Sequence, residues 1–185
     1  MIEDVKQETE ERMDKTIKAL ATNFNKIRTG RAHPSILDGI MVSYYGAATP
    51  LSQVANINIE DARTLAVTPW EKPMVPEIEK AIMKSDLGLN PVTAGENIRI
   101  PMPMLTEETR KGYIKQAKQE AESARVSIRN ARRDALTMLK DFLKEKEISE
   151  DQDRKAQDII QKLTDSFVVK VEKALVAKEA DLMEI

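Results

Sequence analysis

Residues 105–148 read LTEETRKGYIKQAKQEAESARVSIRNARRDALTMLKDFLKEKEI, and apolar residues recur along them at alternating spacings of three and four. This periodicity predicts an α-helix with one apolar face. Thr106, Glu107 and Glu108 open the segment, and acids in the first turn favour a helix start. At about 1.5 Å per residue, roughly 40 residues form a rod of about 60 Å. The apolar face consists of Ile114, Ala117, Ala121, Ala124, Ile128, Ala131, Ala135, Met138 and Phe142.

Five of these nine positions are alanine, so this Ala-rich seam predicts that a partner helix can approach closely. Two more helices are expected. Residues 1–29 carry apolar residues mostly three or four apart, and Gly30 follows as a stop signal. Residues 149–185 begin with Ser149 and Gln152 at the spacing of a capping box. No helix can bury its own apolar face, so the three are expected to pack as an elongated bundle.

Residues 31–104 have a different composition, because all eight prolines lie there. β-rich runs separated by turn residues predict four strands, and a short helix is expected from about Val75 to Ser85. The predicted strands are 39–45, 54–59, 64–68 and 97–100.

The expected fold class is therefore α+β. Residues 1–30 and 105–185 are expected to form the three-helix bundle, and residues 31–104 to form an inserted small domain that is α+β or β-rich. Two adjacent chain crossings connect these parts, which predicts a hinge. The predicted hinge residues are Gly30, Arg31, Ala32, Pro103, Met104 and Leu105.

The composition limits which kinds of partner and which cellular compartment are expected. Net charge is −2, so overall charge predicts no polyanion partner, and any basic site must be local. The sequence has no cysteine, and no apolar run approaches the roughly 18 residues of a membrane span. The start Met1-Ile2-Glu3-Asp4 is acidic, unlike a signal or transit peptide. A cytoplasmic protein with no membrane partner is expected.

Candidate catalytic and metal-binding residues are scarce. The single histidine, His33, precedes Pro34 and is expected to be an exposed loop residue. No nucleotide-binding glycine motif is present. We therefore expect no enzyme, no catalytic residue, no metal site and no cofactor. Tyr44 and Tyr45 are expected to face opposite sides of a strand, and Trp70 is expected to pack over its own small domain.

The long central helix also carries a line of cations, which we call the basic stripe. On a helical wheel at about 100° per residue, with Lys111 as the zero mark, the other six cations fall within about 60° of it, beside the apolar face. From Thr109 to Arg133 there are eight Lys or Arg and two acids, of which only Glu122 lies on the stripe. The basic stripe consists of Lys111, Lys115, Lys118, Arg125, Arg129, Arg132 and Arg133.

A solvated charged face and a binding surface are both consistent with the basic stripe. Apart from Lys111, which follows Glu107 by four residues, the cations are not matched by acids four residues earlier. Arginine also suits phosphate, so we favour binding to a phosphate backbone. Helical RNA fits, because it is read largely by shape. The alternative is a helical adaptor that binds partner helices through its Ala-rich seam. Binding to RNA should weaken steeply as salt rises, whereas binding of helices should not.

Over essentially its full length the sequence resembles the bacterial ribosome recycling factor family. The order and spacing of several stretches carry this resemblance. They are Lys26-Ile27-Arg28-Thr29-Gly30-Arg31-Ala32, Asp61-Ala62-Arg63-Thr64-Leu65, Glu79-Lys80-Ala81-Ile82, Ser85-Asp86-Leu87-Gly88-Leu89-Asn90-Pro91, Ile98-Arg99-Ile100-Pro101, Leu105-Thr106-Glu107-Glu108, Arg129-Asn130-Ala131-Arg132-Arg133-Asp134, Lys146-Glu147-Ile148-Ser149-Glu150-Asp151 and Lys178-Glu179-Ala180-Asp181-Leu182.

The resemblance implies a three-helix bundle with a hinged β/α/β domain at residues 31–104, in an L-shaped, tRNA-like outline. It also implies binding to 23S rRNA of the large ribosomal subunit after termination. With elongation factor G and GTP, such a factor splits the ribosome into subunits and releases it from mRNA, and a monomer is expected. The family's rRNA contacts correspond to Arg129 and Arg132, with Arg28, Arg31 and Arg133 as neighbours.

The sequence departs from the family pattern at the second crossing. Many relatives have two consecutive prolines before the Leu-Thr pair, whereas this chain reads Pro101-Met102-Pro103-Met104. One fewer fixed φ is expected to loosen that crossing.

Overall fold

The computed structural model describes residues 1–184, which divide into two compact units. Unit 1 comprises Met1–Arg28 and Glu108–Met183. Of the described residues, unit 2 holds Thr29–Glu107 and Glu184. Helices and small antiparallel sheets occur together, which confirms the predicted α+β class. In the described part of the chain, no helix is both long and apolar enough to span a membrane.

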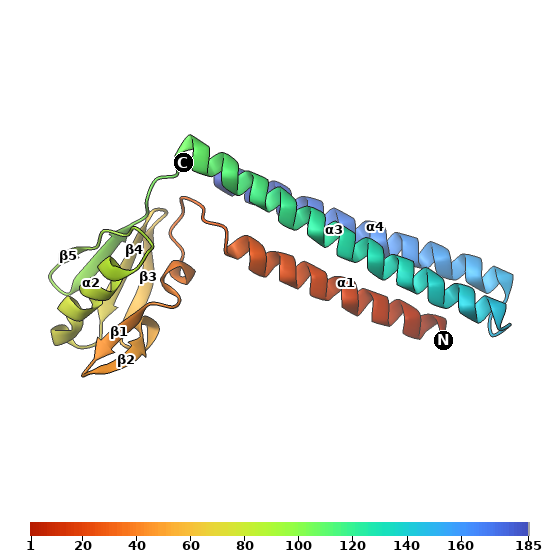
Figure 1. Ribbon diagram of the computed structural model, residues 1–185, viewed down its shortest axis with the longest axis horizontal. Helices are drawn as coiled ribbons and strands as arrows, with labels where there is room; N and C mark the ends of the chain where they lie inside the picture. The colour runs from red at the N-terminus through yellow and green to blue at the C-terminus, as the bar shows by residue number, and fades with distance from the viewer. Residues whose placement is uncertain (185) are drawn as a thin grey trace. The chain divides into compact units, whose positions relative to one another are not determined.

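Unit 1 is a bundle of three long helices, as predicted (Figure 1). They are α1 (Ile2–Asn25), α3 (Glu107–Lys144) and α4 (Glu150–Met183). The last helix was predicted to reach Ile185, a residue outside the described part. Helix α1 is shorter than predicted, because the N–H groups of Lys26 and Ile27 bond three residues back and tighten the chain into a final turn. Gly30 lies beyond this turn and lacks the left-handed φ of a helix cap, so the predicted role as stop is wrong.

The apolar face of α3 follows the prediction for most of the helix and then shifts by one residue. The buried residues are Ala117, Ala121, Ala124, Ile128, Ala131, Ala135 and Leu139. Leu139 is 1% exposed, whereas the predicted Met138 is 37% exposed. Alternating steps of three and four repeat every 3.5 residues, but an α-helix turns every 3.6, so the inward direction drifts along the helix.

The Ala-rich seam is buried inside unit 1, but it does not produce the closest helix pair. Among the three helices, the backbones of α1 and α4 lie close together over the greatest length. We had expected the close approach to involve α3. Near one end of that pair, the Lys178 ammonium of α4 donates to the carbonyl oxygen of Ile27 (3.1 Å). Ala135 of the seam lies in one buried cluster with the larger side chains of Leu139 and Ile160.

Helix α4 begins with the predicted capping box. The Ser149 N–H donates to Gln152 Oε1 (2.9 Å), and the Gln152 N–H donates to Ser149 Oγ (3.1 Å). These reciprocal bonds satisfy two backbone donors that a helix start otherwise leaves without partners.

Unit 2 contains a four-stranded antiparallel sheet in the order β3-β4-β6-β5 and a separate β1-β2 hairpin (Figure 1). Leu65 and Val67 of β4 and Ile98 and Ile100 of β6 are fully buried, together with Ile78 of α2. The strands are β1 (Met41–Tyr44), β2 (Ala47–Pro50), β3 (Ala55–Asp61), β4 (Thr64–Pro69), β5 (Val92–Ala94) and β6 (Asn97–Pro101). The helices are α2 (Val75–Lys84) and three short 3-10 turns, Pro34–Leu37, Leu51–Gln53 and Lys72–Met74.

The four predicted strands and the short helix are present in unit 2, but strands β2 and β5 were not predicted. Both are short and contain no fully buried residue, so they lack the apolar alternation that marks a strand. They form because backbone groups of β1 and β6 pair with them.

Candidate nucleic-acid interface on helix α3

The basic stripe lies on the side of α3 that meets α4. Arg125 Nε donates to Glu172 Oε1 of α4 (2.6 Å), and Arg132 Nη1 donates to Gln161 Oε1 of α4 (3.0 Å). The opposite flank of α3 carries acids that bond to α1. There, Asn23 Nδ2 donates to Glu120 Oε2 (3.0 Å), and Arg12 Nη1 donates to Asp134 Oδ2 (2.6 Å). The two flanks of α3 are therefore sorted by charge.

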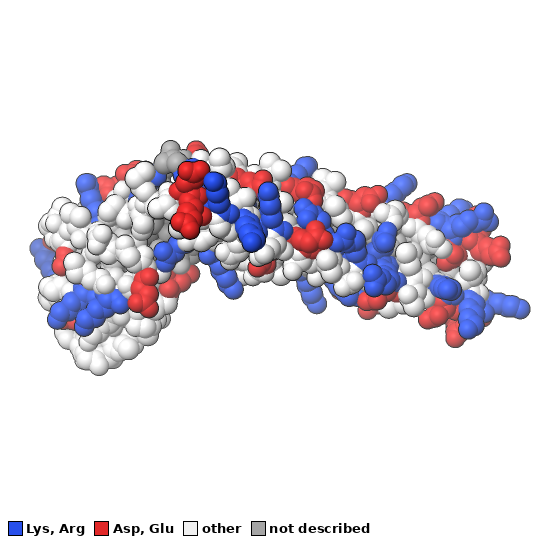
Figure 2. Space-filling view, turned by 45° about the horizontal axis from the view of Figure 1, so that its top comes forward, with Lys and Arg blue, Asp and Glu red and all other residues white. Residues whose placement is uncertain are grey.

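The stripe is less uniform than we predicted, because Glu122 pairs with two of its arginines. Arg125 Nη1 donates to Glu122 Oε2 and Arg129 Nη2 donates to Glu122 Oε1, both at 2.8 Å. These bonds lower the pKa of the Glu122 carboxyl, with Arg125 as the larger cause. Glu122 lies three residues before Arg125 and seven before Arg129, so neither pair has the spacing of four that marks ion pairs along a helix. Figure 2 shows, for one face of the molecule, that Asp and Glu side chains are interspersed among the Lys and Arg side chains.

The remaining cations of the stripe differ in how far their side chains are exposed. Lys115, Lys118 and Arg133 are exposed and have no ion-pair partner among residues 1–184. Arg132 is half-buried, and its Nε is buried without a hydrogen-bond partner there. Lys111 is exposed in the second turn of α3. The stripe thus combines arginines fixed in place with exposed side chains.

Two further arginines were predicted near an RNA interface. Arg28 is half-buried just after α1 in unit 1. Arg31 is exposed in unit 2, where its guanidinium pairs with Glu184.

Ala32 of the predicted hinge and Met102, which precedes the second hinge segment, both bond to one turn of unit 2. The N–H of Ala32 donates to the Ala62 carbonyl (2.8 Å), and the N–H of Met102 donates to the Arg63 carbonyl (2.7 Å). Residues 62 and 63 form the turn between β3 and β4, so both ends of the inserted segment are tied to neighbouring residues.

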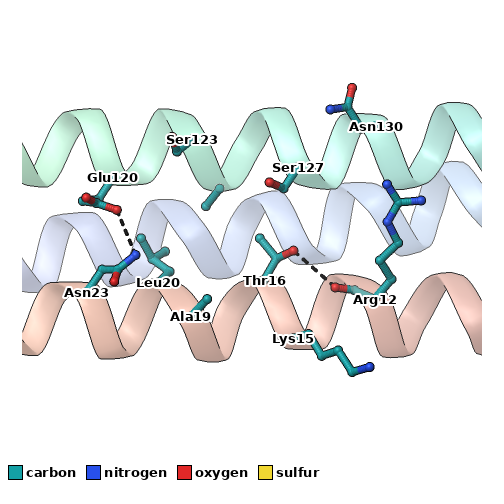
Figure 3. Close-up of a pocket in the computed structure, with 11 residues that line it drawn as sticks. Arg12, Lys15, Thr16, Ala19, Leu20, Asn23, Glu120, Ser123, Ser127 and Asn130 are labelled. Atoms are coloured by element: carbon teal, nitrogen blue, oxygen red, sulfur yellow. Dashed lines mark hydrogen bonds between the residues drawn. The ribbon is translucent and has the colours of Figure 1, made fainter.

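A polar groove of about 410 Å³ lies between α1 and α3 (Figure 3). Ser123, Ser127 and Asn130 of α3 line one wall, and Thr16 and Asn23 of α1 line the other. The hydroxyl of Thr16 donates to the carbonyl of Arg12 within α1 (3.2 Å). Small polar side chains on both walls make this groove unlike the apolar sites that bind helices.

The aromatic residues of unit 2 differ from both predictions. Trp70 is 60% exposed, so it does not pack over its own domain. Tyr44 and Tyr45 do not face opposite sides. Their hydroxyls donate to the two oxygens of Glu71 (2.9 and 2.8 Å), and their rings meet edge to face at 4.6 Å. Tyr45 has a φ of +48° and lies in the turn after β1, so strand alternation does not apply to it.

His33 is exposed, as predicted, and has a local structural role. Its Nδ1 accepts from the Ser35 N–H (3.1 Å) and caps the 3-10 turn that starts at Pro34. Across residues 1–184, no cluster of three or more His, Asp or Glu side chains could hold a metal ion.

Comparison with known proteins reveals close relatives. The sequence profile of the family described as ribosome recycling factor matches residues 20–183. Proteins named ribosome-recycling factor are 72% identical in Saccharophagus degradans, 65% in Marinomonas sp. and 60% in Hahella chejuensis. Each alignment covers all of both chains.

Solved structures agree with this relationship. A solution structure of a ribosome recycling factor has a TM-score of 0.74 and 35% identity, covering 100% of this chain and 98% of that one. A second structure shows Thermus thermophilus ribosome recycling factor and Escherichia coli elongation factor G bound to the E. coli post-termination complex. Its chain has a TM-score of 0.65 and 42% identity, with both chains fully covered. The matched profile and the full-length identities together show that the chain belongs to the ribosome recycling factor family.

Proposed function

We propose that this protein binds the large ribosomal subunit of the post-termination complex and, with elongation factor G and GTP, splits the ribosome into subunits. Full-length relatives at 60–72% identity are the main support. The similar factor bound with elongation factor G to a post-termination complex supports the choice of partners. Members of this family are non-enzymatic, and GTP hydrolysis belongs to elongation factor G. We place the factor in the cytoplasm, as a monomer.

We further propose that the basic stripe is the surface that contacts 23S rRNA. Arg129, Arg132 and Arg133 are the main contacts, Arg125 and the three lysines extend them, and Arg28 and Arg31 contribute from their own segments. The observation that supports this is the sorting of charge on α3, with arginines held beside α4 and acids turned toward α1. Such contacts to phosphate set affinity and register rather than sequence specificity.

The proposed domains are residues 1–30 with 105–185, and residues 31–104, connected by the hinge at residues 30–32 and 103–105. The bonds of Ala32 and Met102 to the β3–β4 turn favour Gly30, Arg31 and residues 103–105 as the positions where rotation occurs. Ala32 is buried in unit 2 and is expected to move with it.

The decisive experiment is a subunit-splitting assay. Post-termination ribosomes are mixed with this protein, elongation factor G and GTP, and subunits are separated by sedimentation. We expect subunits to accumulate only when all three are present. Intact ribosomes in the complete mixture would refute the proposed function.

The rRNA surface is tested with Arg132→Ala. Losing a charge-assisted contact to phosphate is expected to weaken binding to large subunits about tenfold. Helical circular dichroism should stay unchanged. Arg12→Ala is the matched control, because Arg12 is an exposed arginine of α1 that bonds Asp134 on the flank of α3 opposite the stripe. Equal affinity of the two variants would contradict the assignment.

The adaptor alternative is less well supported. All five alanines of the Ala-rich seam are buried inside unit 1, so they are not accessible to another helix. Binding of large subunits measured at several salt concentrations separates the two functions, since phosphate contacts predict a steep loss of affinity as salt rises.

A further inference from the structure

Glu122 lies between two arginines of the basic stripe and uses both of its oxygens. Oε2 accepts from Arg125 Nη1 and Oε1 accepts from Arg129 Nη2, each at 2.8 Å. The two guanidinium groups thus converge on one small anion, and each donates one N–H to it. Guanidinium N–H groups bind carboxylate and phosphate oxygens alike.

The two arginines are held differently. The Arg125 side chain is 22% exposed, and its Nε also donates to Glu172 Oε1 of α4 (2.6 Å). The Arg129 side chain is 50% exposed, and Glu122 is its only ion-pair partner within the described residues. Removing the Glu122 carboxylate would therefore free Arg129, while Arg125 would stay fixed by Glu172.

The bonds to Glu122 are also readily exchanged. The Glu122 side chain is 55% exposed, so water and salt reach its contacts with both arginines. Exposed ion pairs of this kind contribute little to stability, and an incoming anion can replace them at small cost. A phosphodiester group offers two non-bridging oxygens that can take the places of the two carboxylate oxygens.

We propose that Arg125 and Arg129 form a seat for one phosphate group of RNA, which Glu122 occupies in the free protein and leaves on binding. Glu172 is a positioning residue that keeps Arg125 directed at the seat. This inference rests on the proposed function, because it takes ribosomal RNA as the source of the phosphate.

The two acids should then have opposite effects on binding. Glu122 competes with phosphate, so Glu122→Gln is expected to tighten binding. Glu172 orients Arg125, so Glu172→Gln is expected to weaken it. If the two acids acted only by repelling phosphate, removing either one would tighten binding. The sign of the change in affinity caused by Glu172→Gln therefore distinguishes the two explanations.

The experiment measures binding of the labelled full-length protein to purified large ribosomal subunits by fluorescence anisotropy at several salt concentrations. Glu122→Gln is expected to bind about fivefold more tightly, with a steeper dependence on salt, because one more cation is free to meet phosphate. Glu172→Gln is expected to bind about threefold more weakly. Asp141→Asn is the matched control, since Asp141 is an exposed acid of α3 outside the stripe, and should equal the wild type.

Circular dichroism of each variant reports whether α3 and α4 stay folded. If Glu172→Gln loses helicity, Arg125→Lys replaces it. This variant keeps the charge but loses the planar fork, and a loss of about threefold is again expected. Equal tightening by Glu122→Gln and Glu172→Gln, or no effect of Glu122→Gln, would overturn the inference while leaving the rRNA surface intact. A wild-type protein that does not bind large subunits would refute the proposed function itself.

Discussion

At the scale of single residues, Tyr45 has an uncommon backbone conformation. Tyr45 and Gly46 both have positive φ (+48° and +83°) in the hairpin between β1 and β2. Such turns usually contain Asn, Asp or Gly at the first of these positions, because a side chain is strained there. The hydrogen bond from Tyr45 to Glu71 compensates by joining the turn to the segment after β4.

The Tyr44–Tyr45–Glu71 contacts predict an unusual titration. Hydrogen bonds to Glu71 raise the pKa of both phenols above 10.0, because the ionised carboxylate favours the protonated phenol. The hydrogen bonds of the two phenols to Glu71 therefore contribute fully to the free energy of unfolding below pH 10. This contribution is lost as pH rises through the raised pKa values of the phenols. Glu71→Gln should lower both pKa values, seen as earlier phenolate absorbance in a spectrophotometric titration. Glu79→Gln, a control acid in α2, should leave the curve unchanged.

Lys178 is a second residue whose environment predicts a measurable effect. Burial lowers the pKa of its ammonium, which donates to the Ile27 carbonyl. Lys178→Ala should lower the free energy of unfolding by about 1 kcal/mol, since a carbonyl loses its donor. A thermal melt should show a decrease in Tm of a few degrees. The control is Lys162→Ala in the same helix, where an exposed side chain is removed. Equal melting of the two variants would show that the bond is not stabilising.

At the scale of secondary-structure elements, the alanines of α3 leave little space for larger side chains. Ala117 and Ala121 are fully buried. Ala121→Leu adds three carbons to a packed interior and should destabilise unit 1 by about 1–3 kcal/mol. Gln119→Leu places the same side chain at an exposed position two residues away and should have little effect. Urea unfolding followed by circular dichroism compares them, and equal midpoints would contradict tight packing around Ala121.

Much of the helical architecture could be predicted from sequence, because helix periodicity and capping are local properties. The capping box at Ser149 and the inward face of α3 up to Ala135 are examples. Strand β5 was missed although it pairs with the neighbouring β6, because its three residues are exposed and carry no apolar alternation. Contacts between distant elements could not be predicted either, and this limit applies to the candidate interface. The line of cations follows from spacing on one helix, whereas the bond from Arg125 to Glu172 depends on the register of α4 against α3.

At the scale of the whole molecule, the chain contains separate hydrophobic cores. One buried cluster of unit 2 contains Leu65, Ile78 and Ile98, and a buried cluster of unit 1 contains Ala135, Leu139 and Ile160. The two clusters share no residue, so each unit is expected to have a stability of its own.

Matched core variants test this independence. Ile98→Ala should destabilise unit 2 by about 2–5 kcal/mol, and Ile128→Ala should do the same to unit 1. The single tryptophan, Trp70, reports on unit 2 by fluorescence, while helical circular dichroism reports mainly on unit 1. We expect each variant to shift one signal and leave the other in place. Two signals that always move together would show that the units unfold as one.

The bonds of Ala32 and Met102 to the adjacent residues Ala62 and Arg63 have a further consequence. The chain enters and leaves residues 32–102 at neighbouring points, so this segment is a cassette rather than a spacer. A short glycine linker from residue 31 to residue 103 could replace it without stretching the helical unit. Conversely, the cassette could be grafted into a surface loop of an unrelated protein, because its two ends need only the separation that a tight loop already provides.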